Sequence, residues 1–70
     1  MPKTLRLSTL QREVYEAMKK GNVGEEFTVQ QLAEKAKFSE IEVKSILIVL
    51  MARNLIERRN FEGRALYRLR

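Results

Sequence analysis

Seventy residues are enough for one small domain and too few for two. The chain has neither cysteine nor histidine, which excludes disulfides, thiolate or histidine metal sites, and catalysis by a serine–histidine or cysteine–histidine pair. Lysine and arginine total 14 against 9 acidic residues, a net charge of +5. The lack of cysteine fits an intracellular protein, so we expect a basic, cytoplasmic protein without cofactors.

The first predicted helix runs from about Thr9 to Lys20. Ser8 is a candidate N-cap, and Gln11 three residues later completes a capping box. Gly21 can adopt the left-handed conformation that ends a helix, so residues 21–24 should form a loop. Four apolar residues repeat at helical spacing and should face the core: Leu10, Val14, Ala17 and Met18.

Two more helices begin with the same signals. Thr28 and Ser39 are their N-caps, and Gln31 and Glu42 complete the capping boxes. A large apolar residue precedes each cap and another follows it at staple spacing. The second helix should end near Ala36, so that the turn to the next helix consists of only three residues, Lys37, Phe38 and the cap Ser39. This is the spacing of a helix-turn-helix pair, and a short extended segment is expected over residues 25–27, before the pair.

The period of the sequence changes after Asn54, a residue that tolerates the left-handed conformation at a helix end. Residues 55–61 and 64–70 are two candidate strands around a glycine-containing turn at Glu62-Gly63. We expect the inward face of this hairpin to carry three residues: Ile56, Tyr67 and Leu69.

The positive charge is concentrated on the same hairpin. Residues 1–52 have a net charge of +1, whereas residues 53–70 have a net charge of +4 and contain only arginine as the basic residue. Arginine is suited to bidentate contacts with phosphates and base edges, which favours nucleic-acid binding. The alternative interpretation is a solvated terminus that only improves solubility.

The segment TVQQLAEKAKFSEIEVKSILIVLMARNLIERRNFEGRALYRLR carries a family resemblance. It contains a T-x-x-x-L-A motif, the apolar stripe of a capped helix, and an L-I-E-R segment that opens the hairpin. These residues are Thr28, Leu32, Ala33, Val43, Leu47, Leu50, Leu55, Ile56, Glu57 and Arg58. The segment resembles the winged-helix regulators of the MarR-like and ArsR-like type, although Asn54 replaces their usual glycine.

The resemblance covers residues 8–70 and implies an α+β fold, the winged helix-turn-helix, with three helices and a C-terminal β-hairpin wing. We therefore expect a single winged-helix domain over residues 1–70, in which residues 1–7 are an N-terminal tail. Domains of this fold bind duplex DNA, RNA or other proteins, so the resemblance does not by itself decide the ligand.

The third helix presents an unusual outward face. At 100° per residue, the residues opposite its core stripe are Ile41, Ser45, Ile48 and Ala52, with Val49 beside them and Lys44 at one flank. Glu40 and Glu42 in its first turn would oppose phosphates. Three interpretations remain open: the hairpin or the tail covers this face, the face is a protein or self-association interface, or it contacts the DNA groove directly.

We expect a small DNA-binding protein, a transcriptional regulator that contacts duplex DNA through its wing and third helix. The expected DNA contacts are Lys44, Ser45, Arg58, Arg59, Arg64 and Arg68. The alternative is a protein-interaction module of replication or transcription machinery, or a homodimer, that uses Ile41, Ile48, Val49 and Ala52. A purely structural subunit is a third class.

Enzymatic function and membrane insertion are not expected. The sequence contains no glycine-rich phosphate loop, and the pairs Glu25-Glu26 and Glu40/Glu42 have simpler explanations at a loop and a helix end. The longest apolar run, residues 46–52, is far below the ~20 residues that span a bilayer.

Overall fold

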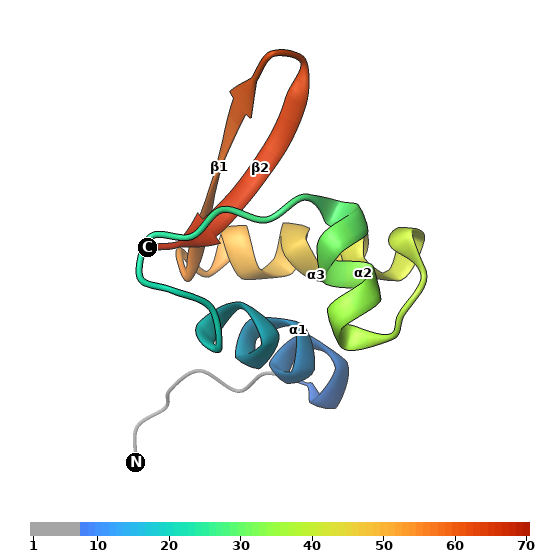
Figure 1. The fold of residues 1–70 in the computed structure, drawn as a ribbon. Coiled ribbons are helices and arrows are strands. Elements are labelled where there is room, and N and C mark those ends of the chain that lie inside the picture. Colours follow the sequence, from blue (N-terminus) through green and yellow to red (C-terminus); the bar gives the residue numbers. More distant parts are fainter. Residues whose placement is uncertain (1–7) are drawn as a thin grey trace.

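Three helices are followed by a β-hairpin, in the order that the sequence predicts (Figure 1). A computed structural model of the chain describes residues 8–70, so the expected tail over residues 1–7 lies outside the described part. The elements are α1 (Thr9–Lys19), α2 (Val29–Ala36), α3 (Glu40–Ala52), β1 (Ile56–Phe61) and β2 (Arg64–Leu69). This arrangement is the α+β winged helix-turn-helix, and each strand is one residue shorter than expected.

All three predicted capping boxes are present. In α2, the Thr28 hydroxyl accepts a hydrogen bond of 3.1 Å from the Gln31 amide, and the Gln31 side chain accepts one of 3.0 Å from the Thr28 amide. Ser39 and Glu42 form the same pair of bonds at the start of α3. Each box satisfies donors that the first turn leaves unpaired, and so defines where a helix begins.

The prediction that Gly21 ends α1 by adopting the left-handed conformation is wrong. The helix stops at Lys19 with Lys20 in a right-handed conformation, and Gly21 is not among the residues with positive φ. Gly21 is needed because the chain passes close to it: a methyl group there would lie 2.8 Å from Cζ of the buried Phe27 ring. The left-handed conformation expected of Asn54 is confirmed, with φ of 60°.

The hairpin is a regular antiparallel pair closed by two residues. Ile56 pairs with Leu69 at its base, and Phe61 pairs with Arg64 beside the turn. Glu62 and Gly63 both have positive φ, the arrangement of a two-residue turn that matches the twist of the strands. The extended segment expected before α2 is also confirmed, because Phe27 and Tyr67 exchange two backbone hydrogen bonds of 2.8 Å.

The core lies where the three helices meet the base of the hairpin. Its fully buried members include Leu47 and Leu50 of α3, the helix that contacts α1, α2 and β1. Both expected inward residues Ile56 and Tyr67 are buried, and Leu69 packs partly against them. The buried set is Val14, Met18, Phe27, Leu32, Ala33, Val43, Ile46, Leu47, Leu50, Ile56 and Tyr67.

Leu10 departs from the predicted core stripe of α1. Its side chain is 47% exposed, because it lies one turn before Val14, at the end of the helix, where no element of residues 8–70 buries it. The remaining members of the stripe are buried or half-buried. None of the helices in the described part of the chain is long and apolar enough to cross a membrane.

Candidate nucleic-acid interface

The outer half of the hairpin projects from the body of the molecule. Figure 1 shows β1 and β2 rising from the end of α3, with their turn well away from the helices. Ile56 and Tyr67 hold the base of the hairpin in the core, whereas residues 58–64 are all exposed. The base of the predicted wing is therefore anchored in the core, and the arginines of its outer half are exposed to solvent.

The register of the strands places the four predicted arginines of the hairpin on two different faces. Arg58 is paired with Tyr67, so its side chain lies on the same face of the hairpin as Tyr67 and Ile56. Nearer the base of the hairpin, this face packs against the core. Arg59, Arg64 and Arg68 lie on the opposite face, because side chains alternate along each strand.

Arg59 is bound to Glu26, a residue 33 positions earlier in the chain. Its Nε and Nη2 atoms donate hydrogen bonds of 2.6 and 2.8 Å to the two carboxylate oxygens. This bidentate bond is the main cause that holds the pKa of Glu26 below its ordinary value, and the nearby Arg68 contributes to the same shift. The Arg59 guanidinium also lies 5.2 Å from the centre of the Phe61 ring.

Arg68 is bound to its cross-strand neighbour. Its Nε atom donates a hydrogen bond of 2.5 Å to the Glu57 carboxylate on β1. Both side chains remain partly exposed, so solvent screens the pair. Two of the four predicted arginines of the wing therefore have a carboxylate partner within the protein, which offsets the charge they present to an external phosphate.

Arg58 and Arg64 have no such partner in the part of the chain that the structure describes. Within residues 8–70, no carboxylate lies within ion-pair distance of either guanidinium, and both residues are exposed. Arg53, which follows α3, is also exposed and has no carboxylate within ion-pair distance among residues 8–70. It is not among the DNA contacts expected from the sequence. Two of the six arginines of residues 53–70 are therefore paired with carboxylates, and fewer guanidinium groups are left to bind an external phosphate than the sequence suggests.

A shallow groove joins Arg64 to the start of α2. It has a volume of about 500 Å³ and is lined by Thr28, Val29, Gln30, Gln31, Arg64 and Ala65. Because Gln31 uses its carbonyl oxygen in the capping box, its amide nitrogen is not needed there and is available as a donor. Gln30 and Gln31 are candidate site residues that the sequence did not indicate, since only folding brings α2 beside β2.

The outward face of α3 is as apolar in the structure as its sequence indicates. Ile41 is 78% exposed and Ile48 is 63% exposed, while Ala52 is exposed and Val49 half-buried. The hairpin therefore does not cover this face, and the N-terminal tail, the other cover expected from the sequence, lies outside the described residues. Lys44 and Ser45 are both exposed beside these apolar side chains.

No protein-family model matches the chain, and no curated protein matches it. Solved structures do share its fold. The zinc-responsive MarR family member ZitR of Lactococcus lactis aligns with a TM-score of 0.77 and 24% identity, over 97% of this chain and 46% of ZitR. A structure of wild-type ZitR in complex with DNA gives the same values.

A second protein extends the similarity. NolR from Sinorhizobium fredii aligns with a TM-score of 0.62 and 23% identity, over 94% of this chain and 81% of NolR. The chain thus has the winged-helix fold of these proteins and spans about half the length of ZitR. The fold expected from the family resemblance is confirmed.

Proposed function

We propose that this protein binds duplex DNA as a winged-helix transcriptional regulator and is not an enzyme. The observation that carries the proposal is the pair of uncompensated arginines, Arg58 and Arg64, on a hairpin that projects from the body. The shared fold with ZitR, which has been solved in complex with DNA, supports the same function. Arg58 and Arg64 contact phosphates, because neither has to give up an internal ion pair.

The polar groove beside Arg64 extends this phosphate-binding surface. Gln30 and Gln31 supply neutral amide donors at the start of α2, where backbone amides also favour an anion. On α3, Lys44 and Ser45 add one cation and one hydroxyl. Most of these contacts reach the sugar-phosphate backbone, so the binding energy depends weakly on base sequence.

Arg59 and Arg68 stabilise the hairpin through internal ion pairs and contribute little of the net positive charge of the phosphate-binding surface. Arg59 holds the hairpin against the segment before α2 through its bonds to Glu26, whereas Arg68 joins β2 to β1 through its bond to Glu57. A phosphate that approaches either arginine also meets a carboxylate beside it, which reduces the net attraction. We therefore assign them a secondary role in DNA binding.

Fluorescence anisotropy with a labelled duplex of arbitrary sequence tests this assignment. The double variant Arg58→Ala/Arg64→Ala should weaken binding about tenfold or more, because it removes two phosphate contacts. The matched control Lys19→Ala/Lys20→Ala removes the same charge from the far end of α1 and should have a much smaller effect. Equal losses in the two double variants would show that only the net charge matters and would contradict the assignment.

The apolar face of α3 supports a second function, protein binding. Ile41 and Ile48 lie on one side of the same helix and are largely exposed, an arrangement that usually marks a contact surface. Self-association through this face would produce a two-fold dimer with two wings, which doubles the phosphate contacts of one module.

A further inference from the structure

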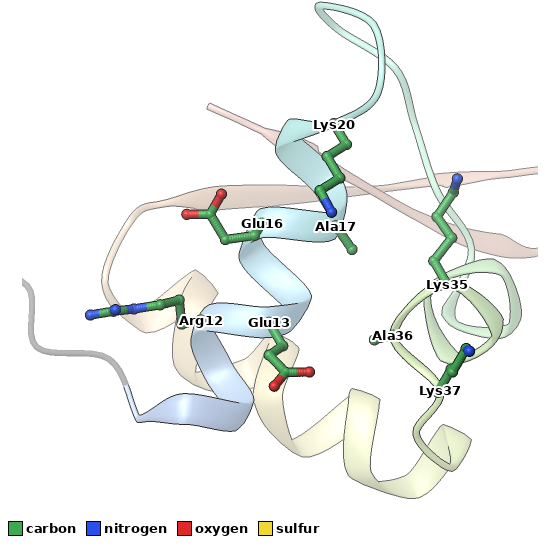
Figure 2. Close-up of a pocket in the computed structure, with 8 residues that line it drawn as sticks. All are labelled: Arg12, Glu13, Glu16, Ala17, Lys20, Lys35, Ala36 and Lys37. Atoms are coloured by element: carbon green, nitrogen blue, oxygen red, sulfur yellow. The ribbon is translucent and has the colours of Figure 1, made fainter.

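A groove between α1 and α2 lies outside the surface assigned to DNA. It has a volume of about 560 Å³ and is open to solvent. Small side chains from the two facing helices, Ala17 and Ala36, line it together with longer charged ones (Figure 2). Because alanine fills little of the space between two helices, the hollow can accept a side chain from outside.

Three lysines surround this groove at the C-terminal ends of the two helices. Lys20 follows α1, Lys35 lies in the last turn of α2, and Lys37 caps α2 in a left-handed conformation with φ of 63°. Figure 2 shows Lys20 on one side of the hollow and Lys35 on the other. Within the described residues, none of these three ammonium groups has a carboxylate within ion-pair distance.

The favourable interaction of lysine with a helix C-terminus explains why each helix ends with one. It does not explain why two alanines leave a hollow between them. The Lys35 ammonium also lies 5.9 Å from the centre of the Phe27 ring, at the outer limit of a cation–π contact. The groove therefore combines an apolar floor with cations spread along its rim.

We propose that this groove binds an acidic, partly apolar peptide segment of a protein partner. The charges are distributed along an open groove and do not converge on one point, so they suit an extended chain better than a small anion, which needs converging donors. A nucleic-acid backbone suits it less, because Glu13 and Glu16 line the same groove and would repel evenly spaced phosphates. A peptide can place its carboxylates only beside the lysines and an apolar side chain over the alanines.

The position of the groove allows both ligands to bind at once. Figure 1 shows the hairpin projecting from the side of the molecule opposite α1. DNA held by the hairpin would leave the end of α1 open. The inferred role is recruitment of an acidic protein to a DNA-bound module, and the peptide contact itself does not depend on the proposed DNA function.

A fluorescein-labelled short peptide, Ser-Glu-Glu-Leu-Ala-Ser, is a suitable probe because its carboxylates are confined to one side of its apolar residues, and Ser-Gln-Gln-Leu-Ala-Ser is its uncharged counterpart. The acidic peptide should bind saturably to the whole chain, and Lys35→Glu/Lys37→Glu should raise its Kd about tenfold or more. Ala17→Leu, which fills the hollow without changing charge, should also weaken binding. Circular dichroism establishes that each variant remains folded.

The matched control is Arg58→Glu/Arg64→Glu, which makes the same charge change on the hairpin and should leave the Kd of the peptide within about twofold. A larger loss in this variant than in Lys35→Glu/Lys37→Glu would place the peptide on the DNA surface and overturn the proposal. Equal affinity for the acidic and uncharged peptides, unaltered binding to Ala17→Leu, or the absence of saturable binding would also overturn it.

Discussion

At the scale of single residues, two glycines in the loop between α1 and α2 are needed for different reasons. Gly24 has φ of +79°, which side chains rarely adopt, but a methyl group there would meet no atom within 4 Å. Gly21 has an ordinary backbone conformation and no space: a methyl group would lie 2.5 Å from Oε1 of Glu25 and 2.8 Å from Cζ of Phe27. The Glu25 carboxylate can move, whereas the buried Phe27 ring cannot.

Gly21→Ala should therefore destabilise the fold by overpacking, at a cost of about 1–3 kcal/mol in the free energy of unfolding. Urea denaturation followed by circular dichroism measures this change. Phe27→Leu removes the contacting ring atom. Gly21→Ala should therefore cost less stability in the Phe27→Leu background than in the parent chain. If Gly21→Ala were as stable as the parent chain, the close approach of Phe27 would be refuted.

At the scale of elements, the ion pair between Glu26 and Arg59 connects the hairpin to the segment before α2. The pKa of the Glu26 carboxyl is lower in the folded protein than in the unfolded chain, chiefly because Arg59 donates two hydrogen bonds to it. The unfolded state therefore takes up the proton first as the pH falls. The contribution of the pair to stability is complete above the ordinary glutamate pKa of about 4.3 and is lost as the pH falls through the folded value.

Glu26→Gln should accordingly be less stable than the parent chain at pH 7, and the difference should shrink as the pH falls below about 4. Urea denaturation at a series of pH values measures the two curves. Glu34→Gln is the control, because Glu34 is exposed and has no ion pair in the described part of the chain. A difference between Glu26→Gln and the parent that stayed constant at all pH values would mean that ionisation of Glu26 plays no part.

The exposed apolar face of α3 is a candidate interface for self-association. If its outward face is an interface, Ile48→Glu should convert a dimer into a folded monomer and weaken DNA binding, because a carboxylate is costly in an apolar contact. Light scattering measures the mass, and circular dichroism reports folding. Val23→Glu is the control, since Val23 is fully exposed in the loop between α1 and α2 and is not on the outward face of α3. A parent chain that is monomeric throughout, and a variant with unchanged DNA affinity, would eliminate the interface.

The helix starts and the hairpin could be predicted because their signals are local. A capping box is complete within four residues, and the left-handed conformation of Asn54 follows from its own side chain. The pair of Arg59 with Glu26 could not be predicted, since it joins positions 33 residues apart that come together only where Phe27 pairs with Tyr67. For the same reason the sequence placed four equivalent arginines on the wing, whereas the structure pairs two of them with carboxylates.

At the scale of the whole molecule, positive charge lies on two separate surfaces. Arg58 and Arg64 are on the projecting hairpin, and the lysines at the ends of α1 and α2 surround the groove on the other side. Charge near the DNA releases counterions from it, whereas distant charge has little effect beyond the screening length of about 8–10 Å. The salt dependence of DNA binding therefore distinguishes the surface that is in contact.

If the unpaired arginines of the wing hold the DNA, the dependence of duplex affinity on salt concentration should reveal how many of them are in contact. With Arg58, Arg64 and Lys44 each neutralising one phosphate, log K should fall against log salt concentration with a slope of about −2.7. In Arg58→Ala/Arg64→Ala the slope should be about −0.9, whereas in Lys19→Ala/Lys20→Ala it should stay close to that of the parent chain. A slope that is the same in all three proteins would contradict the account.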